Sequence, residues 1–92
     1  MSFEWDPDQA EQNFVKHRID FADTIQLFDG DHFTYRSDRD DEERHVAVGL
    51  VGGLIVAVVW TPRGAGVRRI ISARRARDGE KDRYRKSFGS RS

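Results

Sequence analysis

The sequence predicts an α+β fold with two N-terminal helices, a mainly antiparallel four-stranded sheet and one C-terminal helix. Three observations support this prediction. Capping signals and helical spacing mark both ends of the chain, apolar runs fill its middle, and short glycine turns make neighbouring runs antiparallel. Helices before and after such a sheet are expected to pack on one of its faces. At 92 residues the chain is expected to form a single domain, residues 1–92.

Two short helices are predicted near the N-terminus. The first covers residues 7–17, because Asp6 is a suitable cap and Pro7 fits the first helical position. The second covers residues 21–28 and follows Asp20, another capping residue. Three side chains share one side of the second helix and are expected in the core: Phe21, Ile25 and Phe28.

Four strands are predicted in the middle of the chain, over residues 32–36, 44–51, 54–61 and 67–72. The charged residues 37–43 form a loop between the first two strands. Gly52-Gly53 predicts a two-residue hairpin between the next two. The strand at 54–61 is nearly all apolar, so we expect it at the centre of the sheet.

A helix is predicted after the last strand. Five residues recur at helical spacing: Ala73, Ala76, Glu80, Tyr84 and Phe88. Gly79 weakens this helix by ~1 kcal/mol relative to alanine, so a break or restart is expected near Asp78. Arg74 would then lie at a strand-to-helix junction, where Ser72 can cap the helix and backbone N–H groups favour anions.

The charge of the chain reverses at about residue 63. Residues 1–62 carry 5 Lys and Arg against 13 Asp and Glu, whereas residues 63–92 carry 11 against 3. Five arginines lie in one short segment: Arg68, Arg69, Arg74, Arg75 and Arg77. The planar guanidinium of arginine suits bidentate contact with phosphate. A basic face of this kind predicts a nucleic-acid partner.

The composition argues against several other kinds of protein. The chain has no cysteine, so neither disulfides nor thiolate metal sites are expected. Its longest apolar run, residues 54–60, is far shorter than the ~20 residues that span a bilayer. The acidic start does not resemble a secretory signal, so we expect a cytoplasmic protein with no membrane partner. The histidines lack close ligand spacing, so no structural metal is expected.

Several segments resemble the BrnT-type toxins of bacterial type II toxin–antitoxin modules. They follow one another in order over residues 3–84, and the strongest is Arg69-Ile70-Ile71-Ser72-Ala73-Arg74. The others are Phe3-Glu4-Trp5-Asp6, Asn13 with Lys16-His17, Phe21-Ala22, Phe28, Glu43-Arg44, Gly49, Thr61, and Ala76 with Glu80 and Tyr84. The family usually has glycine where this chain has Arg18, which predicts a different turn after His17. It usually has an apolar residue at the position of Arg68.

The resemblance implies a RelE-like fold and an endoribonuclease that shuts down translation. It implies no metal or other cofactor, because the 2′-hydroxyl of the RNA itself attacks phosphorus. The protein then has to move two protons and stabilise the added charge on the phosphate. The implied partner is a small BrnA-like antitoxin with a DNA-binding part, held in a hetero-oligomer that regulates its own promoter.

Nine residues are candidates for this chemistry. His17 is a candidate for acid–base work, Arg69 and Arg74 for contact with the phosphate, and Glu80 for orienting an arginine. The candidates for binding RNA are Lys16, Arg44, Thr61, Arg68 and Tyr84.

Structural roles remain open for the same residues. His17 can support the fold by packing on Phe14, and Arg44 can form a surface salt bridge. Glu80 can pair with a nearby arginine of its own helix, and Tyr84 can lie in the core. Two other functions also remain open, namely a nucleic-acid-binding module without catalysis and a module that only docks the antitoxin.

Overall fold

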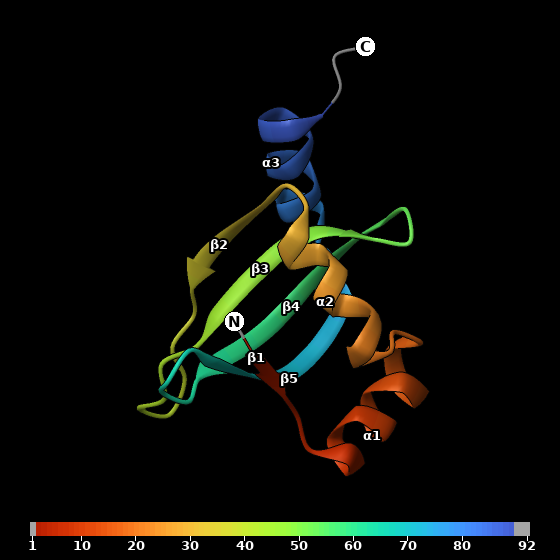
Figure 1. Ribbon diagram of the computed structural model, residues 1–92. Coiled ribbons are helices and arrows are strands. Elements are labelled where there is room, and N and C mark those ends of the chain that lie inside the picture. Colours follow the sequence, from red (N-terminus) through yellow and green to blue (C-terminus); the bar gives the residue numbers. More distant parts are fainter. Residues whose placement is uncertain (1, 90–92) are drawn as a thin grey trace.

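The computed structural model describes residues 2–89, which form a five-stranded sheet with helices on both faces (Figure 1). The elements are β1 (Ser2–Glu4), α1 (Pro7–His17), α2 (Phe21–Asp29), β2 (His32–Arg36), β3 (His45–Val51), β4 (Leu54–Pro62), β5 (Val67–Arg75) and α3 (Asp78–Phe88). The strand order is β1-β5-β4-β3-β2. The predicted α+β class is confirmed, but the sheet has five strands rather than four.

The additional strand, β1, makes the sheet mixed. It pairs parallel with the start of β5, with Ser2 opposite Val67 and Glu4 opposite Arg69, while the other strand pairs are antiparallel. Three residues are too few to show the alternation that identifies a strand in a sequence, so β1 is formed by its pairing with β5.

The two N-terminal helices begin where the sequence predicts. The side chains of Asp6 and Asp20 each accept a hydrogen bond from the backbone N–H two residues later, at 2.9 and 3.0 Å. Arg18 ends α1 in the left-handed conformation, with φ 60° and ψ 31°. The turn expected of a glycine is therefore kept, and the predicted change of turn is wrong. The Arg18 N–H bonds the carbonyl of Phe14, and its guanidinium lies over the Phe14 ring, which offsets part of the steric cost.

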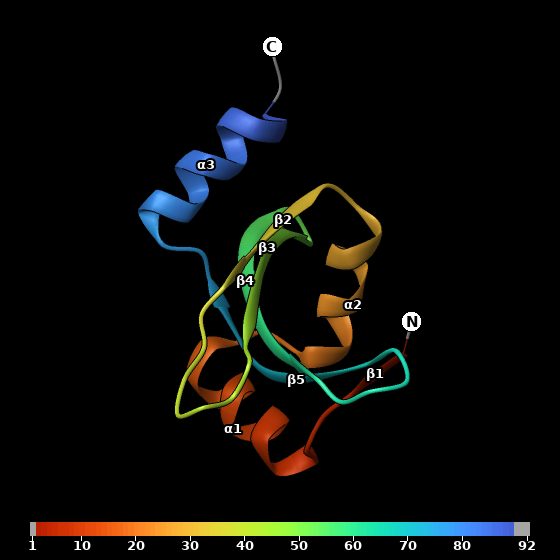
Figure 2. The same cartoon turned by 90° about the vertical axis from the view of Figure 1, so that its left-hand side faces the viewer.

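Apolar side chains are buried on both faces of the sheet. Figure 2 shows α2 and α3 on opposite sides of it. On one face, here the α1/α2 face, the buried core includes Phe21, Leu27, Ala47, Val56, Val58, Trp60, Ile70 and Ala73. On the opposite α3 face, Ala76 and Tyr84 pack with Val46, Val48 and Ala57. The prediction that all helices share one face is wrong, because β3 and β4 are apolar on both sides and need cover on both.

The core side of α2 is only partly as predicted. Phe21 is fully buried, but Ile25 and Phe28 are half-buried. Thr24 and Leu27 are the other fully buried side chains of α2, so the helix is rotated toward them.

The border between β5 and α3 lies later than predicted. Ala73 and Arg74 stand opposite Val58 and Ala57 of β4, and α3 begins only at Asp78. The helix expected from Ala73 and the cap expected at Ser72 are therefore wrong, since pairing with the long strand β4 outweighs helical spacing. Arg74 lies inside a strand.

Candidate functional site

A hollow lined with arginines opens on the part of the α3 face that α3 leaves uncovered. Its volume is about 210 Å³, and we call it the arginine hollow. The residues that line it are Tyr35, Ser37, Arg39, Arg44, Val46, Val59, Ser72, Arg74 and Arg77. Four of them are arginines and none is a carboxylate. Four arginines in one lining make this hollow a candidate site for an anion.

A row of directly opposed residues crosses the sheet beneath this hollow. Tyr35 pairs with Val46, Val46 with Val59, and Val59 with Ser72. Opposed residues project their side chains from the same face of a sheet. The register of four strands therefore brings Tyr35 from β2 and Ser72 from β5 to one surface.

A second hollow, of about 220 Å³, lies beside the first and shares Arg44 with it. Its lining also includes Thr61, Arg63 and Arg69, together with the carboxylate residues Asp6 and Glu42. Arg69 is paired with Glu4 at 2.9 Å, and Arg44 with Glu42 at 2.8 Å. Carboxylates thus offset part of the positive charge here. In the arginine hollow, Arg44 and Arg74 are also paired, but Arg39 and Arg77 form no ion pair within residues 2–89, so this hollow is the more strongly cationic of the two.

The guanidinium of Arg74 is held in a fixed orientation by Glu80 of α3. Its two terminal nitrogens donate to the two carboxylate oxygens at 2.8 and 3.0 Å. The Tyr35 hydroxyl also donates to this carboxylate, and so does the backbone N–H of Arg77, at 2.8 Å. Such a bidentate pair gives geometric specificity as well as energy, so Arg74 is ordered before any ligand arrives.

These contacts set the charge states of the three side chains. Burial alone would raise the pKa of Glu80, but hydrogen bonds from Arg74 and Tyr35 outweigh it and lower this pKa to about 2. The bond to Glu80 raises the pKa of Arg74, and burial raises the pKa of Tyr35. Near neutral pH Glu80 is therefore an ionised, weakly basic carboxylate, suited to positioning Arg74 rather than to moving protons.

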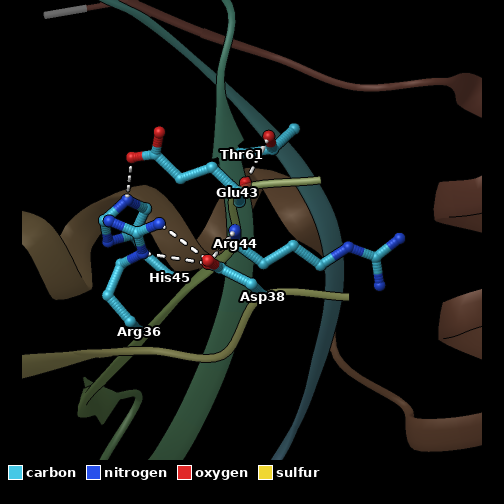
Figure 3. A network of polar contacts seen from close by, with 6 residues as sticks. All are labelled: Arg36, Asp38, Glu43, Arg44, His45 and Thr61. Atoms are coloured by element: carbon cyan, nitrogen blue, oxygen red, sulfur yellow. Dashed lines mark hydrogen bonds and ion pairs between the residues drawn. The ribbon is translucent and has the colours of Figure 1, made fainter. Parts of the chain in front are cut away.

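Polar contacts also hold the loop before β3 (Figure 3). Arg44, the last residue of this loop, lines both hollows. Asp38 accepts two bonds from the Arg36 side chain, at 2.9 and 2.7 Å, and one from the Arg44 backbone at 3.2 Å. The Thr61 hydroxyl donates to the carbonyl of Glu43 at 2.7 Å. The side chain of Arg44 extends away from this network in Figure 3, so the network fixes its backbone and leaves its guanidinium at the hollows.

The structure separates some predicted site residues from the hollows. Arg68 lies on the α1/α2 face, with its guanidinium 4.4 Å from the Trp60 ring and 5.2 Å from the Phe28 ring. Burial there lowers its pKa. Tyr84 is 8% exposed and packs in the core beneath α3, beside the Phe88 ring. The structure thus places Tyr84 in the core, which is the structural role that the sequence left open for it.

His17 and Lys16 are also outside the two hollows. His17 is half-buried at the end of α1, and Lys16 is exposed beside it. Neither is among the lining residues. The structure therefore brings together five of the nine candidates: Arg44, Thr61, Arg69, Arg74 and Glu80.

Of the nine residues that line the arginine hollow, only Arg44 and Arg74 were candidates from the sequence, and Tyr35 and Arg39 are among those that were missed. Side chains of β2 point alternately to the two faces of the sheet. The face to which Tyr35 points depends on how β2 pairs with β3. The loop between them, residues 37–44, makes that register unpredictable from the sequence pattern. Arg39 lies in the same loop, where the surrounding acidic residues give the segment a negative net charge and do not indicate an anion site.

Among residues 2–89, no three His, Asp or Glu side chains lie close enough together to hold a metal ion. None of the helices here is long and apolar enough to cross a membrane.

Comparisons with known proteins place this chain in a family. The model of the BrnT family, described as a ribonuclease toxin of type II toxin–antitoxin systems, matches residues 5–80. The chain belongs to the BrnT toxin family. The crystal structure of the Brucella abortus ribonuclease toxin BrnT superposes with a TM-score of 0.71 and is 31% identical, covering 85% of this chain and 99% of that one. A comparison with curated proteins gives no match.

Membership of the BrnT family confirms the resemblance seen in the sequence. The family is one of ribonuclease toxins, and a type II system pairs its toxin with a cognate antitoxin. The matched residues 5–80 include every residue that lines the arginine hollow, and they end at Glu80. The rest of α3 lies beyond the match.

Proposed function

We propose that this chain is an endoribonuclease that cleaves RNA at the arginine hollow without a metal ion and so inhibits translation. The observation that carries the proposal is the convergence of Arg39, Arg44, Arg74 and Arg77 on one uncovered surface with no carboxylate in its lining. Family membership supports ribonuclease chemistry, and this hollow has the charge that a phosphate requires.

The reaction requires no group beyond the RNA and the protein. The 2′-oxygen attacks phosphorus, and the bond from phosphorus to the 5′-oxygen breaks. The products are a 2′,3′-cyclic phosphate and a 5′-hydroxyl, so the 2′-hydroxyl loses a proton and the 5′-oxygen gains one. Negative charge builds on the phosphate oxygens in the transition state, and ordered donors placed there beforehand stabilise it most. Arg74 is the best ordered of them, because Glu80 holds its guanidinium and Tyr35 in turn bonds Glu80.

The second hollow extends the site along the RNA. Arg44 lines both hollows, and Arg69 and Thr61 line the second. A strand laid across the α3 face would place a neighbouring phosphate near Arg69, which releases Glu4 to bind it. The Thr61 hydroxyl already donates to a backbone carbonyl, so Thr61 supports the loop that carries Arg44. The roles predicted for His17, Lys16, Arg68 and Tyr84 stay predictions.

One observation favours a second function, RNA binding without cleavage. The lining of the arginine hollow contains no histidine, and Glu80 is held as a weakly basic carboxylate. A site with strong cationic charge and few groups that transfer protons can bind RNA and leave it intact.

The cognate antitoxin is proposed to neutralise the chain on this same basic face. An acidic segment of a BrnA-like, DNA-binding antitoxin would occupy the arginine hollow in a hetero-oligomer and exclude RNA. Because the target is translation, both proteins would act in the cytoplasm.

The proposal is tested by incubating the purified protein with total RNA and with a translating extract, each in EDTA. We expect cleavage that survives the chelator and leaves 5′-hydroxyl ends. Cleavage that returns only when a divalent metal ion is added would contradict metal independence. Intact RNA in both preparations, with binding that weakens steeply as salt rises, would support the binding module instead.

A further inference from the structure

A buried asparagine of α1 completes the edge of β5 next to the arginine hollow. Asn13 is 7% exposed. Its Nδ2 donates to the carbonyl of Ala73 at 3.0 Å, and its Oδ1 accepts from the N–H of Ala73 at 3.1 Å. The same Nδ2 donates to the carbonyl of Ile19 at 3.2 Å. One carboxamide therefore satisfies both backbone groups of a single strand residue.

Asn13 bonds the edge of β5 that faces away from β4, at a point where no described strand pairs with this edge. β1 pairs with Val67–Arg69, the first three residues of β5. Beyond them, α1 packs along this edge in the part of the chain that the structure describes. Buried backbone groups without partners are costly, and a carboxamide offers the same donor and acceptor as a peptide group. Asn13 thus takes the place of a neighbouring strand at Ala73.

The other edge of β5 is irregular near the same point. Val59 stands opposite Ser72, whereas the next residue, Trp60, stands opposite Ile70. This shift leaves Ile71 without an opposed residue, as in a β-bulge, and a bulge changes the direction of the side chains that follow it. The bonds from Asn13 hold the strand just after this irregularity.

Ala73 lies between the two β5 residues that line the arginine hollow, Ser72 and Arg74. Its own side chain is buried on the α1/α2 face, so its neighbours project to the α3 face. Arg74 is therefore fixed twice: α3 holds its guanidinium through Glu80, and α1 holds the adjoining backbone through Asn13.

We propose that Asn13 is a positioning residue for the ribonuclease reaction, because it fixes β5 at Ala73 so that Arg74 and Ser72 face the phosphate. The effect on cleavage rests on the proposed function, whereas the effect on Arg74 does not. Several arginines share the binding of RNA, but stabilisation of the transition state depends on the geometry of the best ordered one. Loss of Asn13 should therefore lower kcat and leave KM nearly unchanged.

The test compares Asn13→Leu, which keeps the side-chain size and removes all three bonds, with Thr24→Val. Thr24 is fully buried on α2, where its hydroxyl donates to the Phe21 carbonyl at 2.6 Å. Thr24→Val therefore removes a buried hydrogen bond that does not involve Ala73. With both variants held well below their melting temperatures, we expect kcat to fall at least about tenfold in Asn13→Leu, with KM within about twofold of the parent. Equal effects of the two variants on kcat would overturn the proposal.

Two further variants separate positioning from folding. In an Arg74→Ala background, Asn13→Leu should lower kcat no further, whereas a second multiplicative loss would contradict action through Arg74. Asn13→Asp keeps the acceptor and loses the donor when ionised, but its protonated form regains a donor. Its kcat relative to the parent should therefore rise as pH falls from 7 toward 5, and a flat ratio would contradict the proposal.

A readout without RNA distinguishes failure of this inference from failure of the proposed function. Asn13→Leu should lose amide-exchange protection at Ala73 and shift the side-chain Nε–H resonance of Arg74, while Thr24→Val should do neither. If the parent does not cleave RNA, the ribonuclease proposal fails. An unmoved Arg74 resonance in Asn13→Leu would show that Asn13 does not position this side chain.

Discussion

At the residue scale, the carboxylate of Glu80 joins three elements. It bonds Arg74 of β5, Tyr35 of β2 and the backbone of Arg77 at the start of α3. The sequence predicted that Glu80 orients an arginine, and the structure shows that this arginine is Arg74. Two consequences follow, one for stability and one for activity.

The first prediction concerns Glu80→Gln and pH. The pKa of Glu80 is lowered to about 2 in the folded chain from an ordinary value of 4.5. Its ionised form therefore contributes stability that is fully present above pH 4.5 and is lost as pH falls toward 2. The unfolding free energy of the parent should exceed that of Glu80→Gln at pH 7, and the difference should shrink across this interval. Denaturant unfolding at pH 7, 4.5, 3 and 2 measures it, and a constant difference would contradict the assignment.

The second prediction concerns Tyr35→Phe. This change removes one donor to Glu80 and leaves the bidentate pair with Arg74 in place. We expect a loss of about 1 kcal/mol in unfolding free energy and a modest fall in RNA cleavage. Tyr84→Phe is the matched control, because within residues 2–89 no hydrogen bond from the Tyr84 hydroxyl is present. Equal losses in the two variants would show that the Tyr35 hydroxyl contributes little.

At the element scale, local signals predicted the helices and hairpin well, whereas pairing decided the rest. Asp6 and Asp20 cap α1 and α2 as predicted, and Gly52-Gly53 turns the β3–β4 hairpin with φ of 56° and 84°. β1 and the end of β5 were not predicted, since both depend on contacts with distant strands. The buried role of Asn13 was missed for the same reason.

The third prediction uses neighbouring arginines of β5 that face opposite ways. Arg69 lines the second hollow, whereas Arg68 stacks on Trp60 across the sheet. Both substitutions by alanine remove one positive charge. We expect Arg69→Ala to weaken RNA binding and lower its salt dependence. Arg68→Ala should mainly lower the unfolding free energy, by about 1 kcal/mol, through the lost cation–π contact. Fluorescence binding titrations at several salt concentrations, with denaturant unfolding, measure both. The reverse pattern would place the RNA on the α1/α2 face.

The fourth prediction tests how closely α2 packs on β3. A Cβ atom added at Gly49 would lie 2.8 Å from Cγ of Leu27 and 3.1 Å from the carbonyl oxygen of Asp31. Gly49→Ala should therefore lower the unfolding free energy by about 1–3 kcal/mol. Gly30→Ala is the control, because a Cβ there meets no atom within 4 Å. Thermal unfolding of the two variants decides the point, and an unchanged Gly49→Ala would refute the close packing.

At the scale of the whole molecule, the charge reversal in the sequence indicated a basic surface but not its full composition. Arg74 and Arg77 come from the basic C-terminal part, as expected. Arg39 and Arg44 come from the acidic part and reach the same hollow through the β2–β3 loop. Arg74 and Arg44 were candidates from the sequence, whereas Tyr35 and Arg39 reach the hollow through the sheet register and the β2–β3 loop, which the sequence pattern does not show.

The central claim, that the arginine hollow cleaves RNA, is tested most directly by comparing Arg74→Ala with Arg75→Ala. Arg75 follows Arg74 on β5, is exposed, and stands opposite Val56 of the α1/α2 core. Each variant loses one positive charge, but only Arg74 lines the arginine hollow. The measurement is the single-turnover cleavage rate of RNA in EDTA. The account predicts a fall on the order of 10²-fold for Arg74→Ala and a rate within about twofold of the parent for Arg75→Ala. Equal rates for the two variants, or parental cleavage by Arg74→Ala, would contradict it.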